Sequence, residues 1–224
     1  MKLGLAIPFY NEEECCERVV RDLVEKLRRE GVPYHLALVN NGSTDQTPTL
    51  LNGLASELKG CSVVHLQDNA GYGGGILSGM RSLKTPFLGW HWGDGQIDSL
   101  VVVAAYRAAT ENPDGLAKAI RRERHDGKQR MVISAVFNRA MGLFGASSRD
   151  VNGCPKVFSR EAWGAIAPQS TDWFLDAEVV LAAKELGLNW TEVDAVMKTR
   201  QSGISKVKAA TVFEFLGNLG RRVF

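Results

Sequence analysis

Short apolar segments alternate with amphipathic ones along the first half of the chain. The apolar runs predict buried strands at Lys2–Ile7, His35–Val39, Ser62–Leu66 and Pro86–Trp90. After the first of these runs, apolar residues recur at helical spacing, as Val19 and Val20, Leu23 and Val24, and Leu27 show. This alternation of strands and helices predicts a parallel sheet with helical crossovers.

Polar and glycine residues suggest where the helices begin and end. Asn11 is expected to cap the first helix, with Glu12–Glu14 in its first turn, where the helix dipole favours carboxylates. Gly31 and Pro33 are expected to end that helix. Further helices are expected at Gln46–Leu58, from the glycine-rich loop Asp68–Gly75 through Leu83, and at Asp98–Thr110.

The second half of the chain is less regular. Strands are expected at Gly115–Ile120 and Asn189–Ala195, and a strand-like segment at Asp150–Ser159 is interrupted by Gly153 and Pro155. The run Arg121–Arg130 reads RRERHDGKQR and is expected to form a basic loop. Helices are expected at Met131–Phe144, Phe174–Leu186 and Lys206–Phe224. The last of these either packs on the core or lies at a membrane interface, because it combines an apolar stripe with a terminal Arg-Arg pair.

Composition narrows the function classes. The 224 residues suffice for one large or two small α/β domains, and a net charge of +2 argues against a general binder of nucleic acid. The four cysteines lack zinc-ligand spacing and are expected to be free thiols in a reducing cytoplasm. We expect neither a signal peptide nor a membrane-spanning helix, because no apolar run is long enough.

Four of the predicted strands end in polar loops that carry glycine or asparagine. These loops are Pro8–Glu12, Asn40–Asp45, Asp68–Gly75 and Gly93–Gln96. The carboxyl ends of parallel strands meet at one edge of a sheet, so the four loops are expected to form a single site. Within it, Asp94 and Gln96 offer oxygen ligands of the kind that Mg²⁺ or Mn²⁺ takes, although an isolated solvated turn would have the same composition.

Several other chemistries are excluded by motif. The G-x-G-x-x-G pattern fails because Ile76 occupies its last position, and neither a P-loop nor a G-x-S-x-G motif occurs. Gly71–Gly75 would still suit a phosphate or sugar close to the backbone. Two basic clusters either face solvent or bind phosphate oxygens, the first being Arg121, Arg122, Arg124 and Arg130, and the second Arg200 and Lys206.

These motifs together resemble family 2 glycosyltransferases. The resemblance rests on the segments Ala6–Glu13 (AIPFYNEE), Val39–Asp45 (VNNGSTD), Asn69–Gly73 (NAGYG) and Gly93–Gln96 (GDGQ), which fall in the family's order and spacing. In the second half, DVNG at 150–153, DAE at 176–178 and RQSGISK at 200–206 resemble the branch of dolichol- and polyprenyl-phosphate sugar synthases.

The resemblance implies a GT-A fold, which is an α/β fold with a mainly parallel central sheet and helices on both faces. It also implies a nucleotide-sugar donor, with GDP- or UDP-sugar as the candidates, and Mg²⁺ or Mn²⁺. One domain would span residues 1–224, with a nucleotide-binding half at 1–110, an acceptor half at 111–205 and a C-terminal amphipathic helix at 206–224.

The same resemblance assigns roles to individual residues. Pro8, Tyr10 and Glu12 would line the nucleotide pocket, Val39 and Asn41 would meet the base, and Gly71 would also bind substrate. Asp94 and Gln96 would hold the metal on the diphosphate, and Arg200 and Lys206 would clamp the phosphates. The acceptor phosphate would be received by Arg121, Arg130 and Ser134. The catalytic set would then be Asp94, Arg121, Arg200 and Lys206.

Two departures from the family pattern bear on the function. Asn40 and Asn41 replace a pair of aspartates, and Trp92 replaces the first aspartate of Asp-x-Asp-x-Gln. The leading hypothesis is inverting transfer of a hexose to a polyprenyl or dolichyl phosphate by a peripheral membrane enzyme, with Asp172 or Asp176 as candidate bases if the acceptor is a hydroxyl. The alternatives are a soluble family 2 transferase acting on a hydroxyl, and a nucleotide-sugar binding protein without catalysis.

Overall fold

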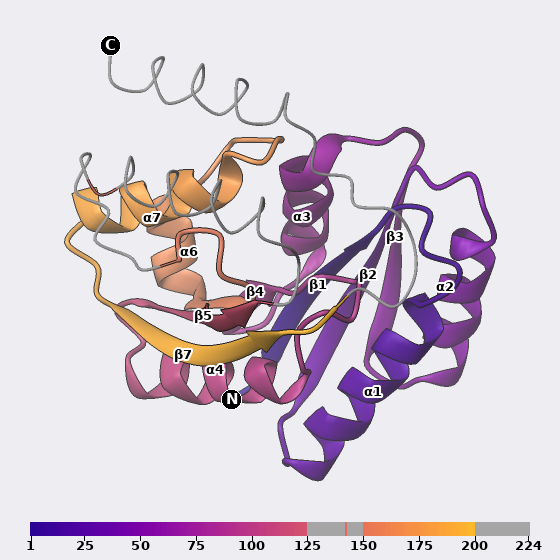
Figure 1. Cartoon of the computed structure of the whole chain (residues 1–224), viewed down its shortest axis with the longest axis horizontal. Helices are drawn as coiled ribbons and strands as arrows, with labels where there is room; N and C mark the ends of the chain where they lie inside the picture. Colours follow the sequence, from indigo (N-terminus) through magenta and orange to yellow (C-terminus); the bar gives the residue numbers. More distant parts are fainter. Residues whose placement is uncertain (125–141, 143–149, 200–224) are drawn as a thin grey trace.

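A single mixed sheet forms the centre of the molecule (Figure 1). The computed structural model describes residues 1–124, 142 and 150–199. The strands of these residues lie in the order β3-β2-β1-β4-β6-β5-β7. Their bounds are β1 Leu3–Phe9, β2 Tyr34–Asn41, β3 Cys61–Leu66, β4 Phe87–Trp90, β5 Leu116–Arg124, β6 Lys156–Ser159 and β7 Trp190–Met197.

The strand directions divide the sheet into two parts. β1 pairs in parallel with both β2 and β4, and β2 pairs in parallel with β3. β6 is antiparallel to its neighbours β4 and β5, whereas β5 and β7 are parallel. The prediction of a parallel sheet for the first half is therefore confirmed, and the strand that continues this sheet into the second half reverses its direction.

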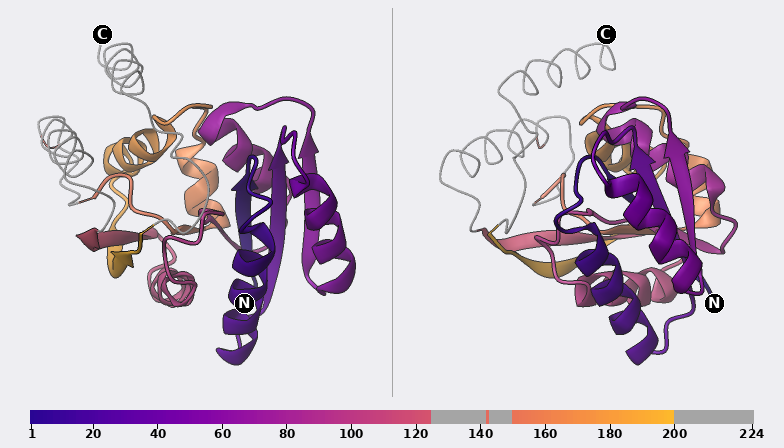
Figure 2. Two further views of the ribbon diagram at one scale, coloured as in Figure 1. Left: turned by 45° about the vertical axis from the view of Figure 1, so that its right-hand side comes forward. Right: turned by 90° about the vertical axis from the view of Figure 1, so that its right-hand side faces the viewer.

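Helices cover both faces of the sheet (Figure 2). One face packs against α1 Cys16–Arg29, α2 Thr47–Glu57 and α4 Leu100–Glu111. The other face packs against α3 Gly71–Ser82, α6 Arg160–Ile166 and α7 Leu175–Glu185. Alternate residues of β1 serve the two sides, since Leu5 and Ile7 face the first core and Ala6 the second.

Two of the predicted helix starts are wrong. Asn11 does not cap a helix, because α1 begins only at Cys16 and the Asn11 side chain instead accepts a hydrogen bond from the Thr44 amide. Asn11 has a φ of 51°, a left-handed conformation that asparagine tolerates better than most residues. In the glycine-rich segment, α3 begins at Gly71, so Gly73–Gly75 belong to a helix and not to a loop.

The second half contains two further differences. Arg121–Arg124 continue strand β5 beside β7 and do not open a basic loop. Helix α6 was not predicted, although Ser159 caps it by accepting a hydrogen bond from the Ala162 amide. The expected helices at Met131–Phe144, apart from Gly142, and at Lys206–Phe224 lie outside the described residues, as do Arg130, Ser134, Arg200 and Lys206.

No helix in the described part of the chain has both the length and the apolar character that a membrane crossing requires.

Candidate functional site

The loops after β1 and β2 are bound to each other at the carboxyl edge of the sheet. The Asn11 amide donates to Ser43 Oγ at 3.1 Å, and the Thr44 amide donates to Asn11 Oδ1 at 2.8 Å. The Gln46 amide donates to the Glu13 carboxylate at 2.8 Å. These reciprocal contacts explain why α1 begins only at Cys16, because the residues after β1 form hydrogen bonds with the neighbouring loop instead of a helical turn.

Glu12 connects the first loop to the fourth. Its side chain is buried, and its amide donates to Thr47 Oγ1 at 2.9 Å. The Cys15 thiol lies 3.3 Å from Glu12 Oε2 and 3.5 Å from the Gly93 carbonyl oxygen, next to Asp94. Three of the four predicted loops are thereby held together. Pro8 and Tyr10 of the first loop are half-buried.

Asn41 binds the third loop. Its Nδ2 donates to the Gly71 carbonyl at 2.9 Å, and its Oδ1 accepts from the Ala70 amide at 3.0 Å. An aspartate in this place would lack the donor. Asn41, which stands where the family pattern has an aspartate, therefore uses both its amide donor and its oxygen to hold the turn at Ala70 and Gly71. Val39 is fully buried, with its side chain near Gly79 of α3.

The glycines of α3 permit close approach of another segment. The Gly74 amide donates to the Thr171 carbonyl at 2.9 Å, and a Cβ at Gly71 would lie 2.6 Å from that same carbonyl oxygen. The first turn of α3 is thus covered by the chain before α7. This contact corrects the expectation that the glycine run offers its backbone to a phosphate or sugar.

Asp94 lies in a tight turn beside the end of β7. Its Oδ1 accepts from the Gln96 amide at 3.1 Å, and Gly95 between them has a φ of 68°. Gln96 is buried, and its Nε2 donates to the Lys198 carbonyl at 2.9 Å, while the Lys198 amide returns a bond of 2.8 Å to the Gln96 carbonyl. The segment that leads to Arg200 is therefore fastened next to the Asp94 turn.

Arg121 is held in a buried ion pair. Its Nε and Nη2 donate to the two oxygens of Asp150, at 2.7 and 2.6 Å. Burial opposes ionisation of Asp150, but the hydrogen bonds and the charge of Arg121 outweigh it, so the pKa of that carboxyl is lowered. The guanidinium carbon lies 5.4 Å from the centre of the Trp92 ring, two residues before Asp94. The structure thus brings Arg121 against Trp92, in the segment that carries Asp94.

Two lysines lie side by side within the sheet, where sequence reasoning did not expect them. Lys118 of β5 is in register with Lys156 of β6, and both are fully buried. Lys118 Nζ donates to the Asp150 carbonyl at 2.6 Å and lies 3.5 Å from a carboxylate oxygen of Glu192. Burial and the neighbouring ammonium of Lys156 lower the pKa of Lys118 to about 8. Isolated lysines inside the apolar runs LAKAI and CPKVF are the signal that could have revealed them.

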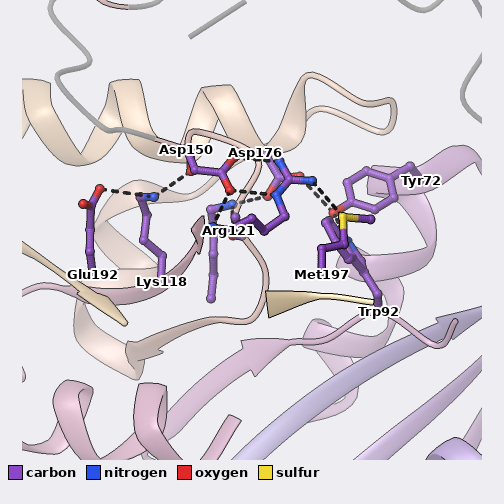
Figure 3. A network of polar contacts seen from close by, with 10 residues as sticks. Tyr72, Trp92, Lys118, Arg121, Asp150, Asp176, Glu192 and Met197 are labelled. Atoms are coloured by element: carbon purple, nitrogen blue, oxygen red, sulfur yellow. Dashed lines mark hydrogen bonds and ion pairs between the residues drawn. The ribbon is translucent and has the colours of Figure 1, made fainter. Parts of the chain in front are cut away.

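Asp176 lies beside Tyr72 (Figure 3) and pairs with the second lysine, Lys156. Its Oδ1 accepts an ion-paired hydrogen bond from Lys156, and its Oδ2 accepts one from the Tyr72 hydroxyl at 2.8 Å. Trp92 Nε1 in turn donates to the Tyr72 hydroxyl at 3.0 Å. The other candidate base, Asp172, accepts from the Phe174 amide at 2.8 Å in the turn before α7.

His91 follows β4 and is buried to 1% exposure. Its Nδ1 has no hydrogen-bond partner among the described residues, and burial lowers the pKa of His91 to about 4. In the unfolded chain, histidine takes up a proton near pH 6.5, so the native state loses stability as the pH falls below that value.

The folded protein is expected to lose about 2 kcal/mol of unfolding free energy through His91 between pH 7 and pH 5. Urea unfolding at the two pH values measures this loss. His91→Gln, which does not titrate, should show a correspondingly smaller difference, and an equal difference in both proteins would contradict the assignment.

The chain is similar in sequence to known glycosyltransferases. Residues 5–161, more than two thirds of the chain, match the family model described as Glycosyl transferase family 2. The glycosyltransferase AglD of Haloferax volcanii is 27% identical over 86% of this chain, and a dolichyl-phosphate beta-glucosyltransferase of Trichomonas vaginalis is 24% identical over 92%. An undecaprenyl-phosphate 4-deoxy-4-formamido-L-arabinose transferase of Serratia proteamaculans is 24% identical over 97%.

The lengths of these relatives differ from that of this chain. The matched region spans 32% of the Haloferax protein, 70% of the Trichomonas protein and 66% of the Serratia protein.

Solved structures share the fold. Glucosyl-3-phosphoglycerate synthase from Mycobacterium tuberculosis, in complex with Mn²⁺, UDP and glucosyl-3-phosphoglycerate, superposes with a TM-score of 0.77 at 18% identity, covering 99% of this chain and 79% of that one. S. aureus TarS in complex with UDP-GlcNAc superposes with a TM-score of 0.65 at 15% identity, covering 96% and 64%. The architecture is therefore GT-A-like, as the resemblance implied.

Proposed function

The chain belongs to glycosyl transferase family 2, and we propose that it transfers a hexose with inversion from a GDP- or UDP-sugar to a polyprenyl or dolichyl phosphate. In this proposal residues 1–110 bind the donor and residues 111–205 bind the acceptor. The observation that carries it is the position of Arg121 against the ring of Trp92, two residues before Asp94, because it brings a candidate acceptor group next to the segment that carries the candidate diphosphate site.

The donor side is supported by the joined loops at the carboxyl edge of the sheet. The nucleotide would contact Pro8, Tyr10, Glu12, Val39 and Asn41, but not the backbone at Gly71, which lies against Thr171. Asn41 is already committed to the third loop through Gly71, so we propose that it shapes the base pocket as well as lining it. Two solved proteins of the same fold were crystallised in complex with UDP or UDP-GlcNAc, which supports a nucleotide-sugar donor.

We propose that the Asp94 turn holds a divalent cation. The described residues hold no group of three or more His, Cys, Asp or Glu side chains that could bind a metal alone. Asp94 and the oxygen of the Gln96 amide would instead share Mg²⁺ or Mn²⁺ with the donor diphosphate, which is how Mg²⁺ is often bound. When bound, such a cation neutralises charge on the departing diphosphate. Arg200 and Lys206 would add to this neutralisation.

A phosphate acceptor is supported by the contacts of the two candidate bases, because both already have hydrogen-bond partners within the protein. Asp176 is bound by Lys156 and Tyr72, and Asp172 by the Phe174 amide. A phosphate acceptor is an anion near neutral pH and needs orientation more than a base. Arg121, Arg130 and Ser134 would receive it. The relatives named for dolichyl and undecaprenyl phosphate support this class, and peripheral attachment to a membrane follows from it as part of the proposal.

Thermal stability with UDP, GDP, CDP and dTDP, each with and without Mn²⁺, tests the donor site. We expect one nucleotide to raise the unfolding temperature of the wild type only with metal, because a ligand that binds the folded state stabilises it. Asp94→Ala should abolish that rise. No shift with any nucleotide would overturn the donor assignment.

Transfer assays then identify the acceptor. With the donor so identified, product is expected with a polyprenyl phosphate and not with the corresponding polyprenol. Product with the alcohol instead would favour the soluble transferase on a hydroxyl acceptor. Nucleotide binding without transfer or donor hydrolysis would favour a binding protein.

A further inference from the structure

Trp92 occupies the position where the family pattern has an aspartate, and its ring lies where two buried charge networks meet (Figure 3). The guanidinium of Arg121 lies 5.4 Å from the ring centre on one side. On the other, the indole Nε1 donates to the Tyr72 hydroxyl at 3.0 Å. Gly93 and Asp94 follow directly in the chain, so Trp92 connects both networks to the Asp94 turn.

The first network holds the Arg121 side chain in place. Asp150 binds its guanidinium through two hydrogen bonds, and the Arg121 amide also donates to Asp150 at 3.0 Å. Lys118 Nζ donates to the Asp150 carbonyl at 2.6 Å and approaches Glu192. Because Asp150 is held at both its carbonyl and its carboxylate, the Arg121 side chain has little freedom to leave Trp92.

The second network fixes the indole. Tyr72 on α3 donates to Asp176 on α7 at 2.8 Å, across 104 positions of the sequence. Asp176 is anchored by Lys156, whose ammonium also donates to the Gly153 carbonyl at 2.8 Å. The Tyr72 ring stacks on Trp173, with ring centres 4.3 Å apart. The hydroxyl that receives the indole is thus held by both its hydrogen bond and its ring.

Both networks bind the backbone of the segment 150–153. Lys118 binds the carbonyl of Asp150, and Lys156 binds that of Gly153 three residues later. Displacement of either network would therefore move the other through this segment and through Trp92. We infer that Trp92 is a positioning residue that sets the distance between the Asp94 turn and Arg121, with Tyr72 holding its indole. This role rests on the proposed function, in which these two groups bind donor and acceptor.

If Trp92 has this role, its replacement should slow sugar transfer more than it slows donor hydrolysis. Loss of the indole hydrogen bond should misplace the acceptor group relative to the donor, whereas water needs no such placement. Trp92→Phe keeps an aromatic ring under Arg121 and removes the indole N–H, and Tyr72→Phe keeps the ring stack and removes its hydroxyl. Trp163→Phe is the matched control, because it makes the same chemical change at a tryptophan that packs against Trp90 and Phe158.

Initial rates of transfer and hydrolysis would be measured for the three single variants and for Trp92→Phe/Tyr72→Phe. Each site variant is expected to lower the ratio of transfer to hydrolysis by roughly tenfold, a cost that a small misplacement can cause. The double variant should be no worse than Tyr72→Phe, because Tyr72→Phe already removes the hydrogen bond from Trp92 together with the bond to Asp176. The control should leave the ratio unchanged. An unchanged ratio in the singles, or multiplied losses in the double variant, would overturn the inference.

A second measurement needs no substrate. The indole N–H resonance of Trp92, identified by its disappearance in Trp92→Phe, is expected to shift in Tyr72→Phe and to stay in place in Trp163→Phe. If it does not move in Tyr72→Phe, the link between the two residues fails. A wild type without transfer would instead overturn the proposed function, whatever the resonance shows.

Discussion

Replacing Lys156 with methionine is expected to lower the free energy of unfolding by about 3–5 kcal/mol, the usual cost of breaking a buried ion pair by removing one partner. Lys156 is fully buried, and its ammonium pairs with Asp176, which is 2% exposed. Methionine fills a similar volume but leaves the carboxylate of Asp176 and the Gly153 carbonyl without their donor. Urea unfolding monitored by tryptophan fluorescence measures the change.

Lys198→Met is the matched control for this prediction. Its ammonium pairs with Asp98 at 3.1 Å, but the Lys198 side chain is 54% exposed, so its loss should cost less than about 1 kcal/mol. Lys156→Met/Asp176→Leu should recover part of the stability, because it removes the stranded charge as well. If both lysine substitutions lowered the free energy of unfolding by the same amount, the predicted effect of burying the Lys156 ion pair would be wrong.

Asp94→Asn is expected to lower the rate of hexose transfer by about 10²–10³-fold, as the loss of one group that stabilises developing charge does in other enzymes. Asparagine keeps an oxygen that can accept from the Gln96 amide, so the turn should persist. What is lost is the carboxylate charge that would bind the cation on the donor diphosphate. Initial rates at saturating donor, across a range of Mn²⁺ concentrations, measure the effect.

Asp114→Asn serves as its control, because Asp114 is exposed in the turn before β5. We expect the wild-type rate from it. If Asp94→Asn retained the wild-type rate at every metal concentration, the proposed metal site would be wrong. A rate that recovers at high Mn²⁺ would support it, since a weaker ligand can be offset by mass action.

The regular elements around the donor edge could be predicted from sequence with small errors at their ends. The apolar runs became β1 to β4, and the residues at helical spacing, such as Val20 and Leu23, face the core. These features are local, because the period of apolar residues decides which face of an element is buried. The meeting of the four loops also followed from local information, since parallel strands place their carboxyl ends at one edge.

The errors lie where a distant segment replaced a local preference. Asn11 looks like a helix cap, but its side chain binds the Thr44 amide 33 positions away. Gly71 and Gly74 look like a phosphate loop, but Thr171 packs against them. Arg121 looks like part of a basic surface, but it lies in β5 with its charge paired to Asp150.

By itself, the sequence determined the fold class, the family and the edge of the sheet at which Asp94 lies, because periodicity and motif spacing are properties of consecutive residues. Only the tertiary structure decided which charges are buried and which groups share Trp92. The partners of Lys156, Tyr72 and Arg121 are 20, 104 and 29 positions away, respectively. A buried charge or polar group without a partner is costly, so these pairs depend on which distant residues packing buries together, and no local pattern encodes that.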